Sequence, residues 1–206
     1  MKGINFYLYL IMAVFSRKIV GRQIYDVESS VQAGDVMRDI CARKAILSNQ
    51  AVLHSDNGSP MKGATMLATL QALGIAPSFN RLAVSNDNPN SESLFKTMKY
   101  RPTYPHMAFE DLLAARQWVG MFVQWYNHEH RHSAIRFVTP AQRHAGINIS
   151  LLEKRALAYG AAKQQRLERW RGATRDWQPV LVMHLNSDQY IKNEQKKGDL
   201  EHTIAA

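Results

Sequence analysis

Short apolar runs alternate with amphipathic stretches along the N-terminal half of the chain. The runs are rich in branched and aromatic side chains, which favour strands. They predict strands at residues 5–15, 18–26, 50–54 and 75–79. The amphipathic stretches carry apolar side chains at helical spacing and predict helices at residues 29–46, at 62–73 and from Asn88 onward. Strands and helices in this alternation are typical of a mixed α/β fold.

Local signals mark where several of these elements begin and end. Ser16-Arg17-Lys18 separates the first two apolar runs and predicts a tight hairpin connection. Gly74 is expected to end the second helix, because glycine readily adopts the left-handed conformation of a C-cap. Asn88 and Pro89 predict the start of the next helix, since a side-chain acceptor precedes a residue that lacks a backbone N–H.

The C-terminal half is predicted to be mostly helical. Residues 109–126 carry a helical apolar stripe, Thr139-Pro140-Ala141 begins a short helix, and residues 151–169 predict another helix with a basic face. That face contains Lys154, Arg155, Lys163, Arg166 and Arg169. Residues 177–186 have the pattern of a final strand, and the polar tail after Ser187 is expected to be disordered.

Composition narrows the class of partner. The net charge of +9 and the pI near 9.8 favour a polyanion, either nucleic acid or an acidic membrane. The single cysteine, Cys41, excludes an internal disulfide and indicates the reducing cytoplasm. The apolar run from Phe6 to Phe15 is too short to span a bilayer and is followed by Ser16-Arg17-Lys18 instead of a cleavage site. We therefore expect a cytoplasmic protein without a membrane partner.

Two carboxylates stand at positions suited to metal chemistry. Asp56 follows a predicted strand, and Glu92 lies in the first turn of a predicted helix, with thirty-five residues between them. Oxygen ligands of this kind are those that Mg²⁺ prefers, and such ions can activate an attacking oxygen at phosphorus. Lys96 and Lys99 share the helix face of Glu92 and suit a nucleic-acid backbone, while Leu94, Phe95 and Met98 are expected to pack on the other side.

Three segments together resemble one family. They are residues 54–60, 85–102 and 125–142, and they resemble the DDE transposases of bacterial insertion sequences, relatives of retroviral integrases. The resemblance implies a ribonuclease H-like mixed sheet flanked by helices at residues 1–145. It also implies a C-terminal helical and strand extension with a disordered tail at residues 146–206.

The same resemblance implies an activity. It is metal-dependent phosphoryl (strand) transfer on DNA, the reaction of DNA integration and transposition. Asp56 and Glu92 would hold Mg²⁺ or Mn²⁺, while Lys96, Lys99 and Arg131 would contact DNA. The partners implied are transposon ends and target DNA, together with further copies of the chain or a full-length transposase.

One family feature is missing from the sequence. Relatives carry a first catalytic aspartate on a strand that would precede residues 6–11, whereas the first acidic residue here is Asp26. We expect the chain to be N-terminally truncated, to lack the first, central strand of the sheet, and to be inactive alone. In the resembling fold that strand lies between the first strand present here and the strand that ends at Asp56, so two inner edges are expected to lack a partner.

Two other functions stay open at this point. The first is a non-catalytic DNA-binding protein that modulates transposition. The second is a zinc hydrolase, because His128-Glu129 followed by His132 spells a helical metal-binding motif in which Glu129 acts as the base. The helix is expected to end near Asn127, which argues against the zinc site.

Overall fold

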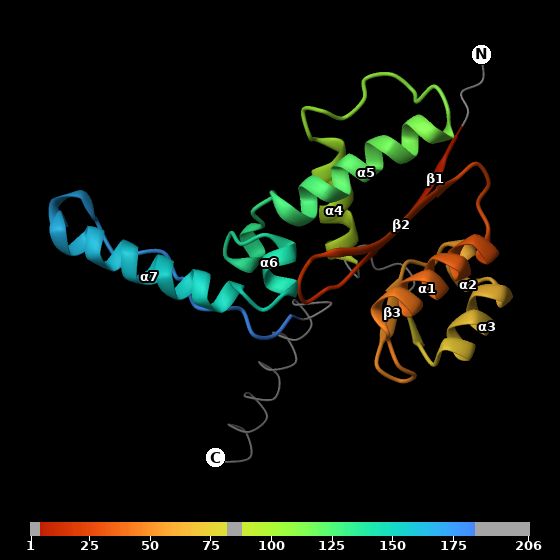
Figure 1. Ribbon diagram of the computed structural model, residues 1–206, viewed down its shortest axis with the longest axis horizontal. Coiled ribbons are helices and arrows are strands. Elements are labelled where there is room, and N and C mark those ends of the chain that lie inside the picture. Colours follow the sequence, from red (N-terminus) through yellow and green to blue (C-terminus); the bar gives the residue numbers. More distant parts are fainter. Residues whose placement is uncertain (1–4, 82–87, 184–206) are drawn as a thin grey trace, which may run out of the picture. The chain divides into compact units, whose positions relative to one another are not determined.

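The computed structural model describes residues 5–81 and 88–183 (Figure 1). The predicted tail after Ser187 lies outside these residues. The chain divides into two compact units: Val20–Gln117 together with the residues up to Ile11, and Met12–Ile19 together with Trp118–Val182. The alternation of strands and helices in the first unit confirms the mixed α/β class. No helix in the described ranges is both long enough and apolar enough to cross a bilayer.

Strands in the first unit form two separate small sheets. The connection of residues 13–18 joins β1 (Tyr7–Met12) and β2 (Ile19–Tyr25) as the predicted hairpin (Figure 1). A second sheet pairs β3 (Val52–Ser55) with β4 (Ala76–Phe79) in parallel. Within the described ranges each sheet has two strands, and no strand joins one sheet to the other.

Helix α1 (Ser30–Lys44) is the centre of the first unit's core. Ser29 caps it, since its side chain accepts a hydrogen bond from the Val31 N–H. The buried cluster is formed by Ala33, Val36, Met37, Ile40, Cys41, Met66, Leu70 and Ile75. Side chains of both sheets pack against this cluster, among them Tyr9 from β1, Val20 from β2 and Leu53 from β3. Burial of apolar surface against α1 therefore holds both sheets.

Two short helices complete this layer. They are α2 (Ser59–Lys62) and α3 (Ala64–Leu73), where the sequence predicted one helix at residues 62–73. Helix α3 packs closely on α1, because a Cβ at Gly34 would lie 3.0 Å from Thr69 Oγ1. Gly74 ends α3 in the left-handed conformation with φ +65°, as predicted. The first unit also contains α4 (Pro89–Lys99).

A long helix, α5 (Leu112–His128), begins in the first unit and ends in the second. Near its C-terminal end, Val119, Phe122 and Tyr126 are buried, which confirms the predicted stripe. The buried side chain of Asn127 makes two hydrogen bonds to one residue of β2. Its Oδ1 accepts from Ile19 N at 2.9 Å and its Nδ2 donates to Ile19 O at 3.0 Å.

The rest of the second unit is helical with an irregular return. Its elements are η2 (Ser133–Ile135), α6 (Pro140–His144), α7 (Asn148–Gln165) and η3 (Leu167–Arg169). Thr139 caps α6 through a capping box with Gln142, at the predicted start. Helix α7 ends at Gln165 and η3 follows, so the predicted helix at residues 151–169 is interrupted after Gln165.

The predicted strand at residues 177–186 is wrong for its described part. Residues 177–183 form no strand, and the remainder lies outside the described ranges. Arginine side chains occupy the carbonyl groups that a neighbouring strand would need: Arg136 Nε donates to Gln178 O and Arg143 Nη2 to Val180 O. Trp177 is buried with Ile135, Val138 and Leu152, so the apolar pattern reflects core packing.

Gly74→Ala is expected to destabilise the protein more than Gly146→Ala. Both residues have positive φ, +65° and +76°, which costs an L side chain about 1–2 kcal/mol. Only at Gly74 would the new Cβ also meet backbone, with Ser48 Cα at 2.9 Å, whereas nothing lies within 4 Å at Gly146. Urea unfolding followed by circular dichroism measures both losses; equal losses would show that residue 48 moves aside freely.

Candidate functional site

Asp56 lies at the edge of the sheet where the parallel strands β3 and β4 end. Its Oδ1 accepts a hydrogen bond from the Gly58 N–H at 3.2 Å, so the side chain closes its own turn. Asn57 Nδ2 donates to the Asn80 carbonyl at 3.0 Å and ties this turn to the residue after β4. The Asp56 side chain is exposed, and in the described part of the chain no hydrogen bond engages its second oxygen.

Glu92 lies in the first turn of α4, and the start of this helix is the predicted one. The Asn88 side chain accepts from the Ser91 N–H at 3.3 Å, and Pro89 occupies the first helical position. The partial positive charge of a helix N-terminus favours a carboxylate there. The Glu92 side chain is exposed.

Helix α4 separates an exposed polar face from a buried one. Lys96 and Lys99 are exposed with Glu92, while Leu94 and Met98 are 4% and 7% exposed. Phe95, predicted to pack with the apolar side chains, is 36% exposed. Its position around the helix axis lies between Met98 and Lys99, at the border of the two faces, so only part of the ring is covered.

The candidate site residues fall into both units. Asp56, Glu92, Lys96 and Lys99 belong to the first unit, whereas the exposed Arg131 belongs to the second. Carboxylate oxygens are the donors that Mg²⁺ takes, so the chemistry of the two acids fits a divalent cation. Within residues 5–81 and 88–183, no three His, Cys, Asp or Glu side chains come together in a metal-binding cluster.

The helical zinc motif has no helix to carry it. Helix α5 ends at His128, whose side chain is exposed. His132 lies beyond that end, in an antiparallel bridge with Val138. The His132 Nδ1 accepts a hydrogen bond from the Ala134 N–H at 3.2 Å. The two histidines therefore do not share one helical face, and the geometry of the zinc hydrolase hypothesis is absent.

The second unit contains buried basic side chains that sequence reasoning missed. Arg17 is 8% exposed and adopts a left-handed φ of 63° within the hairpin connection, where the sequence gives no sign of burial. Arg143 on α6 is 3% exposed. Its Nη2 donates to the Val180 carbonyl at 2.7 Å, and its guanidinium lies 4.2 Å from the centre of the Phe15 ring.

Two histidines lie near this basic group. The His130 ring stacks on Tyr126 with centroids 5.4 Å apart and meets the His132 ring at 5.8 Å. Burial lowers the pKa of His130 and raises that of Tyr126 to about 12. Burial, together with repulsion from Arg17 and His130, lowers the pKa of His132 to about 4. His132 is therefore neutral at pH 7, with its proton assigned to Nε2 because Nδ1 accepts the Ala134 N–H.

Comparison with known proteins confirms the family that residues 54–60, 85–102 and 125–142 resemble. Two family models, each described as Integrase core domain, match the chain, one at residues 1–83 and the other at residues 73–140. Together the two matches cover residues 1–140 of the 206. The chain therefore belongs to the integrase core family.

Its relatives include proteins of bacterial insertion sequences. The transposase for insertion sequence element IS904 of Lactococcus lactis is 28% identical over 135 residues, which are 65% of this chain and 53% of the relative. A protein of insertion element IS136 of Agrobacterium fabrum is 33% identical over 88 residues, which are 43% of this chain and 45% of the relative. The chain spans about half the length of the curated relatives it matches.

Solved structures with a similar course include the catalytic core domain of BIV integrase. That likeness has a TM-score of 0.49 and 17% identity, and covers 69% of this chain and 88% of the other. The simian T-cell lymphotropic virus intasome, in complex with PP2A regulatory subunit B56 gamma, gives a TM-score of 0.49 and 15% identity. It covers 66% of this chain and 47% of the other.

The neutral His132 predicts a loss of stability in acid. Its pKa is about 4 in the folded protein against an ordinary value of 6.5, so the unfolded chain binds more protons between these values. The stabilising contribution is complete above pH 6.5 and is lost as the pH falls toward 4. His132→Asn keeps an acceptor for the Ala134 N–H but cannot titrate, so we expect it to flatten this acid limb.

Urea unfolding at a series of pH values checks the slope, independently of absolute stability. His106→Gln, at an exposed position, is the matched control and should leave the pH profile unchanged. An acid limb that survives in His132→Asn would assign it to another group.

Proposed function

We propose that this chain acts in DNA transposition, and that its integrase core binds DNA for metal-dependent phosphoryl transfer. Asp56 and Glu92 are the metal-binding carboxylates of this proposal, and Lys96 and Lys99 contact the DNA backbone. Arg131 is a further proposed DNA contact. The family match at residues 1–140 and the relatives encoded by insertion sequences support it.

One observation carries the proposal: α4 presents a carboxylate and two cations on the same exposed face. Glu92, Lys96 and Lys99 have no ion pair with another residue in the described part of the chain, and all three are exposed. A structural salt-bridge network would use these charges internally. A face that keeps them available suits a ligand with both metal and phosphate.

Each residue has a defined part in this chemistry. A divalent cation held by Asp56 and Glu92 would supply charge neutralisation at the reacting phosphate. The turn at Asp56 fixes that carboxylate through Gly58, while Glu92 is presented from the first turn of α4. Lys96 and Lys99 provide positive charge for the DNA backbone along the next two turns.

We further propose that the 206-residue chain, assayed alone, does not complete strand transfer. The chemistry depends on positioning by several carboxylates, and the described residues bring no third metal-binding side chain to Asp56 or Glu92. The second candidate function is DNA binding that modulates transposition without chemistry. It is favoured by the same lack of a third metal-binding side chain among the described residues. It predicts DNA binding that needs no metal.

Asp56→Asn and Glu92→Gln are each expected to weaken Mn²⁺ binding on the order of tenfold or more. Each substitution removes a charged oxygen ligand and keeps the size of the side chain. Calorimetric titration of the chain with Mn²⁺ measures the change. Glu28→Gln, an exposed acid on the loop before α1, is the matched control and should bind Mn²⁺ as the unmodified chain does.

Equal Mn²⁺ affinity in all four proteins would contradict the metal site. A strand-transfer assay with Mg²⁺ or Mn²⁺ on a matching element end tests the proposed inactivity separately, and no product is expected. Product that disappears with Asp56→Asn would refute the inactivity and support the role of Asp56.

The double variant Lys96→Ala/Lys99→Ala is expected to weaken DNA binding and its dependence on salt. Two lost phosphate contacts lower the slope of log affinity against log salt by about 2 for duplex DNA. Fluorescence anisotropy with labelled duplex DNA measures this slope. Lys44→Ala, exposed at the end of α1, is the control; an unchanged slope in the double variant would exclude α4 as a DNA contact.

A further inference from the structure

Several cations at the C-terminal end of the second unit are used internally. Arg155 Nη1 donates to the carbonyls of Arg136 and Phe137 at 3.1 Å, and Lys163 Nζ donates to Gly172 O at 2.8 Å. Arg136 pairs with Asp176 at 2.6 Å. These contacts hold the segment after η3 back along α7, so this part of the chain has a defined tertiary structure.

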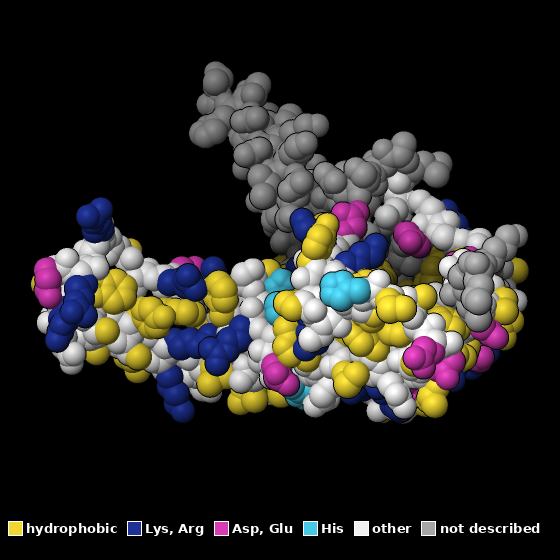
Figure 2. All heavy atoms as spheres, turned by 90° about the horizontal axis from the view of Figure 1, so that it is seen from above, with side chains coloured by type: hydrophobic (Ala, Val, Ile, Leu, Met, Phe, Trp, Pro, Cys, Tyr) yellow, Lys and Arg dark blue, Asp and Glu magenta, His cyan; other side chains and the backbone are white. Residues whose placement is uncertain are grey.

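Arg166 and Arg169 differ from these cations. Both side chains are exposed, and within the described ranges neither guanidinium makes a hydrogen bond or an ion pair. Figure 2 shows Lys and Arg side chains spaced along the α7 end, with hydrophobic side chains between them. Charge that takes no part in folding is therefore concentrated where α7 passes into η3.

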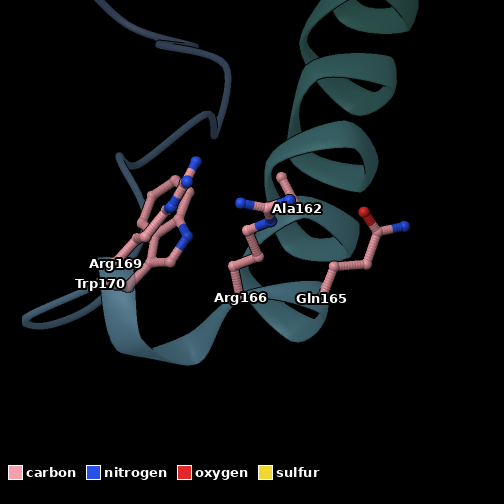
Figure 3. Close-up of a pocket in the computed structure, with 5 residues that line it drawn as sticks. All are labelled: Ala162, Gln165, Arg166, Arg169 and Trp170. Carbon is pink, nitrogen blue, oxygen red and sulfur yellow. The ribbon is translucent and has the colours of Figure 1, made fainter.

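These two arginines line a cleft with an aromatic wall. The cleft has a volume of about 330 Å³ and is lined by Ala162, Gln165, Arg166, Arg169 and Trp170. Figure 3 shows the Arg166 side chain extending between α7 and Trp170, while the Gln165 amide points to the opposite side. Tyr159 meets Trp170 edge-on with centroids 6.2 Å apart, and Trp170 is only partly exposed. The indole is thus held in place beside two available guanidinium groups.

We infer that this cleft between α7 and η3 binds a nucleotide of single-stranded DNA. Its base stacks on Trp170, and its flanking phosphates contact Arg166 and Arg169. A flat aromatic ring beside cations is the combination by which proteins bind single strands. The volume lies at the lower end of ligand-sized pockets and accommodates one such group.

Charge and position on the chain support this assignment. Residues 148–182 contain seven Lys or Arg and three Asp or Glu, which attracts a polyanion. These residues lie beyond 1–140, the part that the integrase core family matches, so the cleft is distinct from the carboxylates at Asp56 and Glu92. The inference rests on the proposed function only in the choice of DNA as the nucleic acid.

The test measures binding of labelled oligothymidylate, and of a duplex of equal length, by fluorescence anisotropy in EDTA. We expect Arg166→Ala/Arg169→Ala to weaken single-strand binding about tenfold and to lower the salt slope by about 1.4, for two phosphates. Trp170→Ala is expected to weaken it about tenfold with an unchanged slope, because stacking releases no counterions. The duplex, whose bases are already stacked, should be insensitive to Trp170→Ala.

Lys154→Ala is the matched control, since Lys154 is exposed on the same helix but lies outside the cleft. If Lys154→Ala lost as much single-strand affinity per removed charge as Arg166→Ala/Arg169→Ala, the arginine effect would reflect general charge alone. That result would overturn the proposed binding cleft. No effect of Trp170→Ala, with circular dichroism unchanged, would overturn base stacking. EDTA removes any metal, so this binding is measured apart from the proposed metal site. Lys96→Ala/Lys99→Ala tests the α4 contact separately, so either proposal can fail without the other.

Discussion

Burial against helix α1 is the constraint on which the first unit depends. A two-stranded sheet alone is at best marginally stable in water, and this unit contains two within its described residues. Both pack on the cluster to which α1 contributes Val36, Met37 and Ile40. Gly21 of β2 allows the closest approach, because a Cβ there would lie 2.6 Å from Ile40 Cγ1. The position of Asp56 follows from this packing, since Leu53 anchors β3 to the same cluster.

Local sequence signals predicted where the elements begin and end better than they predicted the tertiary contacts of the side chains. Gly74, Asn88 with Pro89, and Thr139 all act where their own backbone chemistry requires, so neighbouring residues sufficed to predict them. The buried Arg17 interacts with Tyr126 and His132, which lie far along the chain, and no nearby residue signals its burial.

The strand predicted at residues 177–186 failed in its described part, residues 177–183, for the same reason. Its apolar pattern matches a strand, but Trp177 fills a core formed with α7, and arginines take the carbonyls of Gln178 and Val180. The candidate carboxylates Asp56 and Glu92 were predicted only in part. The elements that carry them and their exposure were predictable from the sequence, whereas any further metal-binding side chain beside them depends on tertiary structure.

The positive charge of the chain has two different uses. Arg143 and Arg155 donate to backbone carbonyls that lie outside strands and helices, and Arg116 donates to the Ile24 carbonyl of β2. Such arginines replace missing secondary-structure hydrogen bonds and satisfy buried polar groups. The net charge of +9 therefore overstates the surface available to a polyanion. Only cations without such partners, such as Arg166 and Arg169, remain to recognise one.

The side chain of Asn127, a helix residue, makes the hydrogen bonds that a neighbouring strand would make to Ile19. A carboxamide carries one acceptor and two donors, and here it offers Ile19 the same pair of groups as a neighbouring peptide bond. Aspartate has the same shape but only acceptors, so it would face the Ile19 carbonyl with a second oxygen. Glutamine carries the right groups on a longer stem. The requirement for asparagine at position 127 thus comes from Ile19 of β2, which lies 108 residues earlier in the chain.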